Sequence, residues 1–456
     1  MKIMRNLRMA TSPAALCGGV LVLLAATTSA LEAQIPAPRQ DRPIALTGAT
    51  IHTVTNGTIQ NGTILFEDGK IIAIGTNVQI PTHAERIDAT GKHIYPGLVD
   101  AHNVLGMFEI GGIDVTIDVN ELGDFNPNVR AHVAVNPESR HLGVARSNGV
   151  LVSVSSPSGG IISGHSSAMM LDGWTWEQMT LKPETGLIVN WPNMGGGGFG
   201  GGGFGGGGGG GGRNPQQIYD DNVRSIRDFF ADSRAYHASR RAAPERHNTD
   251  VRFEAMDGVL NGTTPVLVVA NELRQIQDAI TWAEQEGVRM VLVGGRDAGY
   301  VAPLLAQRNI PVLLSSVLTS PNRQWEPYDK AYALPAELHA AGVQFGITGG
   351  TSAAYANRLP YEAGAAIAYG LPEDVALQAV TMNPARFLGF EDRVGSLEVG
   401  KDATLLITTG NPLEYSTEIE QAFIEGRMID MEDAHRRFFE KYSEKLRQLQ
   451  GRPIIP

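Results

Sequence analysis

The chain has 456 residues, with 37 Lys and Arg against 48 Asp and Glu, and a formal net charge of −11 at pH 7. Hydrophobic residues make up 42% of the chain and charged residues 19%, a composition typical of a globular protein that excludes a disordered or fibrous one. Because an acidic protein has few cations to displace counterions from a phosphate backbone, we expect no nucleic-acid partner.

The N-terminus has the pattern of a secretory signal peptide. Basic residues precede an apolar run over residues 20–26, and small residues then lead to Ala30 and Ala33. The apolar run is too short to span a hydrocarbon layer of about 30 Å, and no later stretch of ~18 apolar residues follows. We therefore expect residues 1–33 to be removed and the mature protein to be exported, to the periplasm or the medium, without a membrane span. Because the single cysteine, Cys17, lies in this segment, disulfides and cysteine-based metal sites are excluded from the mature chain.

Short strands come first in the mature chain and return near its end. Residues 34–93 predict a small antiparallel sheet, in which Asp68 and Gly69 have the composition of a type I′ hairpin turn. From about residue 264 apolar strands alternate with amphipathic helices, a pattern typical of a parallel sheet that is buried on both faces. Residues 390–430 again predict short strands, which we expect to rejoin the first sheet.

Two further segments have distinctive compositions. Residues 195–212 contain sixteen glycines interrupted only by two phenylalanines. A phosphate-binding loop usually adds a lysine and has glycine at a few set positions, so we interpret this run as a flexible surface insertion. Residues 431–456 predict a terminal amphipathic helix, and we expect its apolar side to cover the surface of the domain.

The most specific motif is the run at residues 91–106, which contains Pro-Gly-Leu-Val-Asp-Ala-His-Asn-Val. Together with residues 357–363, 376–388 and 394–403, this run resembles the amidohydrolase superfamily, most closely its imidazolonepropionase-like secreted members. The resemblance extends over nearly the whole mature chain. Each motif alone would be weak, whereas the four together are a specific signal.

The resemblance implies an α/β fold with two parts. Residues 94–389 would form a (β/α)8 TIM barrel that carries the glycine-rich insertion, and residues 34–93 and 390–430 would form a composite β-sandwich. In the superfamily, one or two metal ions bind at the carboxyl ends of the barrel strands. Their ligands are a His-x-His pair, a carboxylated lysine or a glutamate, two further histidines and an aspartate, and the metal activates a bound water.

The metal-ligand positions of the superfamily are mostly lost from this chain. His102 is present, but five of the six positions have no coordinating side chain: Val104, Ile188, Val269, Gly294 or Gly295, and Gly349 or Gly350. Valine and isoleucine coordinate nothing, and a single imidazole competes poorly with water for Zn²⁺. We therefore expect neither a bound metal nor another cofactor.

The remaining candidate site residues are His102 and Asp100. We expect His102 to line a residual pocket, and Asp100 either to orient a neighbour by hydrogen bonding or to cap backbone amides at a strand end. The other histidines expected near a barrel mouth are His132, His141 and His165, for which a structural role is favoured over metal ligation.

A serine-hydrolase site is a weaker hypothesis. Ser166 lies in a Gly-His-Ser-Ser-Ala run that resembles the nucleophile turn of α/β-hydrolases. That turn joins a strand to a helix, whereas a further strand and a turn are expected after Ser166. The context therefore disfavours a nucleophilic serine.

Two functions remain open. The first is an exported amidohydrolase relative that is degenerate in catalysis and acts as a ligand-binding subunit or as the partner of an active paralogue. The alternative is an active hydrolase of C–N bonds in cyclic amides or acyl-dipeptides, with Zn²⁺ at an unconventional site around His102. The missing ligands favour the first function. The sequence leaves open whether the protein forms a homo- or hetero-oligomer.

Overall fold

The computed structural model describes residues 35–193, 214–246 and 248–450. From Pro36 onward these residues belong to one compact unit. The expected signal peptide with Cys17, the glycine-rich insertion and the last six residues of the expected terminal helix lie outside the described residues.

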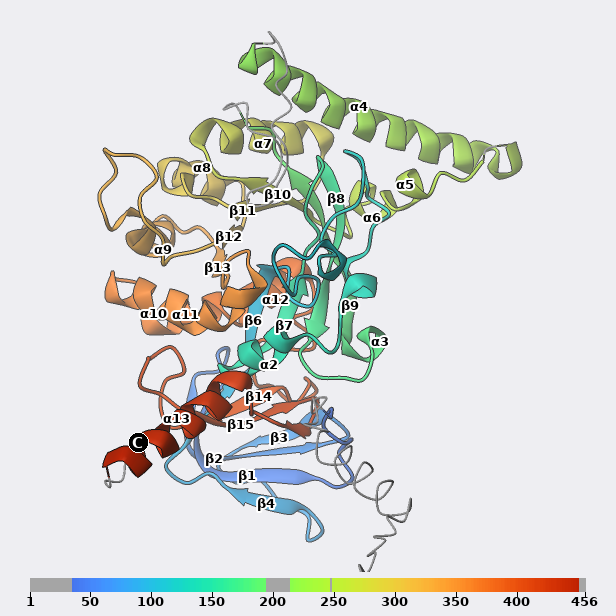
Figure 1. The fold of residues 1–456 in the computed structure, drawn as a ribbon. Helices are drawn as coiled ribbons and strands as arrows, with labels where there is room; N and C mark the ends of the chain where they lie inside the picture. Colours follow the sequence, from blue (N-terminus) through green and yellow to red (C-terminus); the bar gives the residue numbers. More distant parts are fainter. Residues whose placement is uncertain (1–34, 194–213, 247, 451–456) are drawn as a thin grey trace, which may run out of the picture. The chain divides into compact units, whose positions relative to one another are not determined.

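Strands from both ends of the chain form one composite sheet (Figure 1). Its order is β16-β15-β14-β5-β1-β2-β3, with β4 beside β1. The strands are β1 (Ile44–His52), β2 (Thr58–Glu67), β3 (Lys70–Gly75), β4 (Glu85–Asp88), β5 (His93–Pro96), β14 (Leu405–Thr408), β15 (Ile419–Ile424) and β16 (Arg427–Ile429). Both residues of the turn between β2 and β3, Asp68 and Gly69, have positive φ angles of 49° and 78°, as the expected type I′ turn requires. The return of the C-terminal strands to the N-terminal sheet is confirmed.

A second sheet of eight strands forms the barrel. Its strands follow the chain: β6 (Leu98–Asn103), β7 (Val150–Ser155), β8 (Ile162–Met170), β9 (Thr180–Asn190), β10 (Val266–Ala270), β11 (Met290–Gly294), β12 (Val312–Leu314) and β13 (Phe345–Ile347). Apart from β8, neighbouring strands are parallel and mostly buried on both faces. The predicted fold class, an α/β barrel with a composite sheet, is confirmed.

The barrel departs from a regular (β/α)8 arrangement at β8. This strand runs antiparallel to both of its neighbours, β7 and β9. The connections before and after β8 are too short for a helical crossover, and a short connection between neighbouring strands forces them to be antiparallel.

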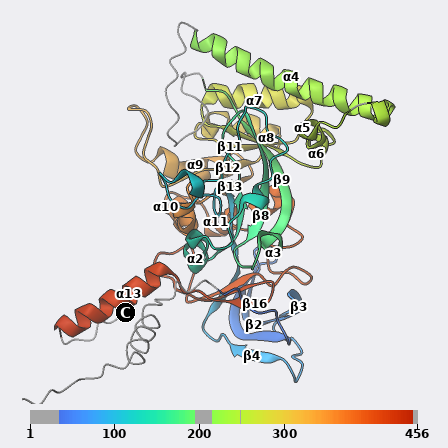
Figure 2. The same cartoon turned by 45° about the vertical axis from the view of Figure 1, so that its right-hand side comes forward.

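Helices surround the barrel sheet and end in one isolated helix at the C-terminus (Figure 2). They are α2 (Arg140–Ser147), α3 (Trp176–Met179), α4 (Pro215–Ala242), α5 (Val251–Glu254), α6 (Asp257–Leu260), α7 (Leu273–Glu286), α8 (Ala302–Gln307), α9 (Lys330–Ala340), α10 (Leu359–Ala368), α11 (Glu373–Ala379), α12 (Met382–Leu388) and α13 (Ala434–Gln450), with 3₁₀ turns η1 (Asp114–Thr116), η2 (Ala131–Ala134), η3 (Pro244–Arg246), η4 (Ala298–Val301) and η5 (Ala353–Arg358). None of the helices within the described ranges has the length and apolarity needed to cross a bilayer.

The helix α7 illustrates how local sequence sets these elements. A capping box between Glu272 and Gln275 starts the helix, and Gly287 ends it in the left-handed conformation at φ 65°. Its buried face includes Ile276 and Trp282, and the edge of the Trp282 indole contacts the ring of Phe230 from α4 at a centroid distance of 5.1 Å. The long helix α4 is therefore an outer layer on α7.

A buried ion network joins the composite sheet to the barrel. Arg427 from β16 donates to Asp172, which follows β8, at 2.6 Å, and Arg146 from α2 donates to the other carboxylate oxygen at 3.2 Å. Burial raises the pKa of Asp172, and the two guanidinium groups oppose that shift. Because breaking a buried ion pair leaves an uncompensated charge, this network constrains how the two sheets are connected.

The terminal helix α13 does not cover the domain in the way the sequence suggested. Phe438, Phe439 and Tyr442 expose 54%, 66% and 53% of their surface. The expectation that the apolar side of this helix packs on the domain is therefore wrong. Amphipathic spacing predicts the helix itself, but it does not determine which surface covers the apolar side.

Candidate functional site

The carboxyl end of β6 carries a group of buried polar side chains. Asp100 and Asn103 are fully buried, and His102 is partly exposed although both of its ring nitrogens are buried. Asp100 accepts a hydrogen bond from the backbone N–H of Gly349 at 3.1 Å and another from Nδ2 of Asn103 at 3.0 Å. Asn103 also donates to the carbonyl of Gly350 at 2.8 Å. These bonds connect the first barrel strand to the segment that follows the last one.

Burial shifts the two titratable groups of this site in opposite directions. It raises the pKa of the Asp100 carboxyl to about 7, although the donors from Gly349 and Asn103 favour the charged form. It lowers the pKa of the His102 imidazole to about 4. At neutral pH His102 is therefore uncharged, and Asp100 is close to its titration midpoint.

Several polar atoms of this group have no hydrogen-bond partner in the part of the chain that the structure describes. They are Nδ1 and Nε2 of His102, Oδ1 of Asn103 and Oγ of Ser153. Ser153 is the register partner of Asp100 on the parallel strand β7, so the two side chains lie on the same side of the sheet. We call Asp100, His102, Asn103 and Ser153 the β6 cluster. Unpartnered buried polar atoms of this kind are commonly satisfied by water or by a ligand.

The other histidines predicted near the barrel mouth bind elsewhere. His132 pairs through Nδ1 with the hydroxyl of Ser167 at 3.0 Å, and His165 pairs through Nε2 with the carbonyl of Ala255 at 3.0 Å. His141 pairs with the backbone carbonyl of Glu109 at 3.2 Å. The structure therefore brings none of these three rings into hydrogen bonding with the β6 cluster.

Ser166 has the surroundings of a structural serine. It is fully buried in the strand β8, shares a hydrogen bond with the hydroxyl of Thr185 at 2.8 Å and donates to the carbonyl of Gly186 at 3.1 Å. No imidazole is among these partners, and the strand continues beyond Ser166 to Met170. A nucleophile turn is therefore absent here, as the sequence context suggested.

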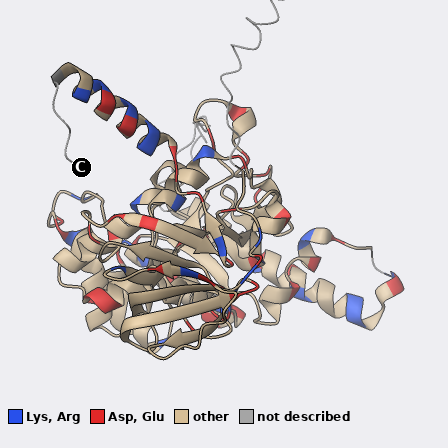
Figure 3. Cartoon of the chain, turned by 90° about the horizontal axis from the view of Figure 1, so that it is seen from below, with Lys and Arg blue, Asp and Glu red and all other residues tan. Residues whose placement is uncertain are grey.

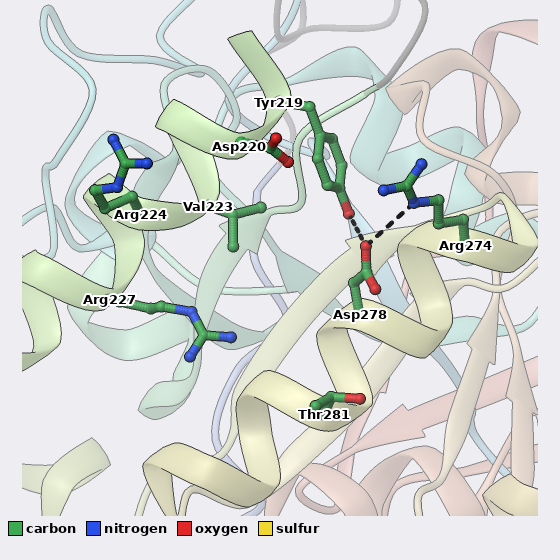
Figure 4. Close-up of a pocket in the computed structure, with 8 residues that line it drawn as sticks. All are labelled: Tyr219, Asp220, Val223, Arg224, Arg227, Arg274, Asp278 and Thr281. Atoms are coloured by element: carbon green, nitrogen blue, oxygen red, sulfur yellow. Dashed lines mark hydrogen bonds and ion pairs between the residues drawn. The ribbon is translucent and has the colours of Figure 1, made fainter. Parts of the chain in front are cut away.

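A surface groove of about 350 Å³ lies between α4 and α7, away from the β6 cluster (Figure 4). Tyr219 and Arg274 both point at Asp278: the tyrosine hydroxyl donates to Oδ2 at 2.6 Å, and Nε of Arg274 lies 3.7 Å from the same oxygen. Among the polar side chains that Figure 4 draws, these three pair with one another, whereas Asp220, Arg224 and Arg227 bond to Gln216, Asp221 and Gln285. None of the residues that line the groove belongs to the β6 cluster.

Comparisons with known proteins place the chain in a family. The Amidohydrolase family profile matches residues 329–429. A crystal structure of an amidohydrolase from Thermotoga maritima superimposes with a TM-score of 0.73 and 27% identity, over 85% of this chain and 99% of that one. The chain belongs to the amidohydrolase superfamily.

Shorter segments of this superfamily member match curated relatives. An imidazolonepropionase of a Geobacillus species is 47% identical over 51 residues, 10% of this chain and 12% of that protein. A deacetylase of Agrobacterium fabrum is 39% identical over 83 residues, 18% and 20% of the respective chains. The matched segments thus span only about a tenth to a fifth of the curated relatives.

The residues of this amidohydrolase-superfamily protein do not fit the metal centre that the superfamily implies. Ile188 is buried, and Val104 and Val269 have no donor atoms. A Cβ atom on Gly349 would lie 2.9 Å from the carbonyl oxygen of Ala356, so an aspartate does not fit there without a shift of the backbone. No group of three or more His, Cys, Asp or Glu side chains within the described ranges is arranged to hold a metal ion. The absence of a bound metal stays a prediction.

One buried carboxylate at the same end of the barrel was not predicted from the sequence. Glu362 in α10 accepts hydrogen bonds from the backbone N–H groups of Val317 and Leu318, at 2.6 and 2.7 Å, and from the hydroxyl of Ser316. It thereby holds the loop that follows β12, and burial raises its pKa. A lone glutamate in an otherwise apolar helix was the available signal, because such a residue needs buried donors.

Proposed function

We propose that this amidohydrolase-superfamily protein is an exported ligand-binding subunit, or the partner of an active paralogue, that does not carry out metal-dependent hydrolysis. The observation that supports this most directly is the contact between Asp100 and Gly349. Gly349, one of the two candidate positions for the superfamily's eighth-strand aspartate, has no side chain, and its backbone N–H donates to the carboxylate of Asp100. A Cβ on Gly349 would lie 2.9 Å from the carbonyl oxygen of Ala356, and the other candidate position, Gly350, has a φ of 93°, at which an aspartate would be strained.

The β6 cluster supports binding of a small polar molecule. A neutral imidazole offers one donor and one acceptor, a serine hydroxyl offers both, and the amide oxygen of Asn103 accepts. These atoms complement a neutral group such as an amide or an imide better than an anion, because Asp100 lies among them. Leaving them unpartnered costs about 1–3 kcal/mol for each buried group, which favours occupation by a ligand or water.

Export rests on the signal-peptide pattern of the first 33 residues. Under this proposal the mature protein works in the periplasm or the medium, where its lack of cysteine makes it indifferent to the redox state.

Metal content and ligand binding test this proposal together. The purified mature protein is incubated with Zn²⁺ or Mn²⁺, desalted and analysed by mass spectrometry for bound metal, and then assayed against imides, lactams and acyl-dipeptides. We expect no stoichiometric metal and no turnover, but an increase in the melting temperature with at least one compound of the panel, because a ligand that binds only the folded state stabilises it.

Two histidine variants complete the test. The ligand-induced increase in melting temperature should be lost in His102→Ala. It should be kept in His339→Ala, which changes an exposed histidine of α9. One tightly held ion per chain, with metal-dependent turnover that disappears in His102→Ala, would falsify the proposal and support an active hydrolase.

A further inference from the structure

The terminal helix α13 presents an apolar face to solvent. Its large apolar side chains are all exposed, by 46% to 73% of their surface: Phe438, Phe439, Tyr442, Leu446 and Leu449. At about 100° per residue these five positions fall within an arc of roughly 100°. An exposed, contiguous apolar stripe of this kind usually marks an interaction surface.

Basic and acidic residues both occur along α13 (Figure 3). By the same helical spacing, Lys441 and Lys445 lie along one border and Arg436 lies beyond the other. Arg447 lies next to the acidic side and is paired with Glu444 at 2.6 Å. The two acidic residues, Glu440 and Glu444, lie on the side opposite the apolar stripe. The segment from Ala434 to Gln450 contains five Lys or Arg and two Glu, in a chain whose net charge is −11. The helix is thus a basic element of an acidic protein.

The start of α13 is anchored to the composite sheet. Asp433 accepts from the backbone N–H of Arg436 at 3.0 Å, and the guanidinium of Arg436 donates to the carbonyl of Ile419 in β15 at 3.2 Å. The contacts that hold the helix are therefore at its first turn. They leave the apolar stripe uncovered along the following three turns.

We propose that α13 is a membrane-surface helix that lies in the interface of an anionic lipid bilayer. Long basic side chains at the borders of an apolar stripe can reach lipid phosphate groups while their aliphatic parts stay in contact with the acyl chains. Acidic residues on the opposite side of the helix face water. Pairing with a second copy of α13 is less favourable, because it brings Lys441, Lys445 and Arg436 of both helices to the edges of one seam. This surface is independent of the β6 cluster and of the proposed function.

Vesicle binding tests the proposal with the full mature protein. The protein is sedimented with vesicles of neutral phosphatidylcholine, or of phosphatidylcholine with 30% phosphatidylglycerol, at low and high NaCl. We expect about tenfold more protein on the anionic vesicles at low salt and a several-fold decrease at high salt, because salt screens the lysine and arginine charges. Absence of binding to either vesicle, or equal binding to both, overturns the proposal.

Substitutions identify the surface that binds. The double variant Phe439→Ser and Leu446→Ser should lose at least about five-fold in binding, because the apolar stripe is interrupted. The matched control Leu122→Ser changes a side chain that is 94% exposed in the loop after β6, and it should bind as the unmodified protein does. A loss of binding in the control instead assigns the membrane contact to that loop and overturns the proposal.

A charge variant and the oligomeric state separate the remaining outcomes. Lys441→Glu with Lys445→Glu should abolish the preference for anionic vesicles while leaving the apolar face intact, and it carries the test if the serine variant fails to fold. Light scattering on the protein in solution should show no dimer that depends on Phe439 and Leu446. Such a dimer, without vesicle binding, would show that a second copy covers the face and would overturn the proposal.

Discussion

The backbone N–H of Gly349 donates to Oδ1 of Asp100 at 3.1 Å, across 249 residues of sequence. This bond joins the end of β6 to the segment after β13, where the barrel sheet has no ladder between its first and last strands. The carboxylate that follows the Pro-Gly-Leu-Val run thus has a structural partner at Gly349, one of the two positions where the resemblance would put a metal-binding aspartate. Three predictions follow from the atoms around this contact.

An aspartate introduced at residue 349 should destabilise the protein without creating a metal site. The new Cβ would lie 2.9 Å from the carbonyl oxygen of Ala356 and 3.1 Å from Oδ2 of Asp100. Overpacking of a buried site costs about 1–3 kcal/mol, and a second carboxylate beside Asp100 adds repulsion. We expect Gly349→Asp to lower the melting temperature and to bind no Zn²⁺.

Gly111→Asp is the matched control, because its Cβ meets only the ring of Phe108 at an ordinary 3.5 Å. It should melt close to the unmodified protein. A Gly349→Asp protein that is as stable as this control and holds Zn²⁺ would instead indicate a dormant metal site.

Asp100 should weaken the folded state as the pH rises. Its folded pKa of about 7 lies above the ordinary pKa of an aspartate, 3.8, so between pH 4 and 7 the folded state holds a proton that the unfolded state has released. Stability from this group is present below pH 4 and is lost as the pH rises to 7, by on the order of 4 kcal/mol. Asp100→Asn removes this dependence. In urea titrations, the unfolding free energy of Asp100→Asn minus that of the unmodified protein should rise from pH 4 to pH 8.

The exposed Asp114 provides the control for this pH series. Asp114→Asn should give a difference that stays nearly constant over the same range. If Asp100→Asn behaves in the same way, the carboxyl of Asp100 does not titrate in the folded state as described.

His102 should have the opposite pH dependence. Its folded pKa of about 4 lies below the ordinary pKa of a histidine, 6.5, so the unfolded state takes up a proton first as the pH falls. Stability from this group is present above pH 6.5 and is lost as the pH falls to 4, by about 3 kcal/mol. His102→Leu removes this loss and also two buried, unpartnered nitrogens.

We therefore expect His102→Leu to be more stable than the unmodified protein, by a larger margin at pH 4.5 than at pH 8, in denaturation by urea. His339→Leu, at an exposed position of α9, should show no such difference. A His102→Leu protein that is less stable at both pH values would mean that the ring has partners in the folded state. As the pH rises from 4 to 7, Asp100 lowers the free energy of unfolding and His102 raises it. The two effects partly cancel in the unmodified protein, so the variants are needed to separate them.

Patterns that act over short distances determined much of this protein from its sequence. Short apolar runs, alternating with amphipathic helices in the second half of the chain, predicted strands, and Asp68 with Gly69 predicted a turn whose geometry needs only two adjacent residues. The sequence also shows that the side chains of Val104, Ile188 and Val269 cannot coordinate a metal, because a side chain without donor atoms binds no metal in any fold.

Contacts between distant segments were decided only by the tertiary structure. The antiparallel direction of β8 depends on the length of its connections, and the partners of Asp100 and Glu362 lie far away in the sequence or on another element. The apolar side of α13 has the spacing of a packed helix but is exposed, because no local pattern determines which surface packs against a helix. Periodicity fixes which residues share a face, whereas burial, pKa and hydrogen-bond partners arise only when remote segments are brought together.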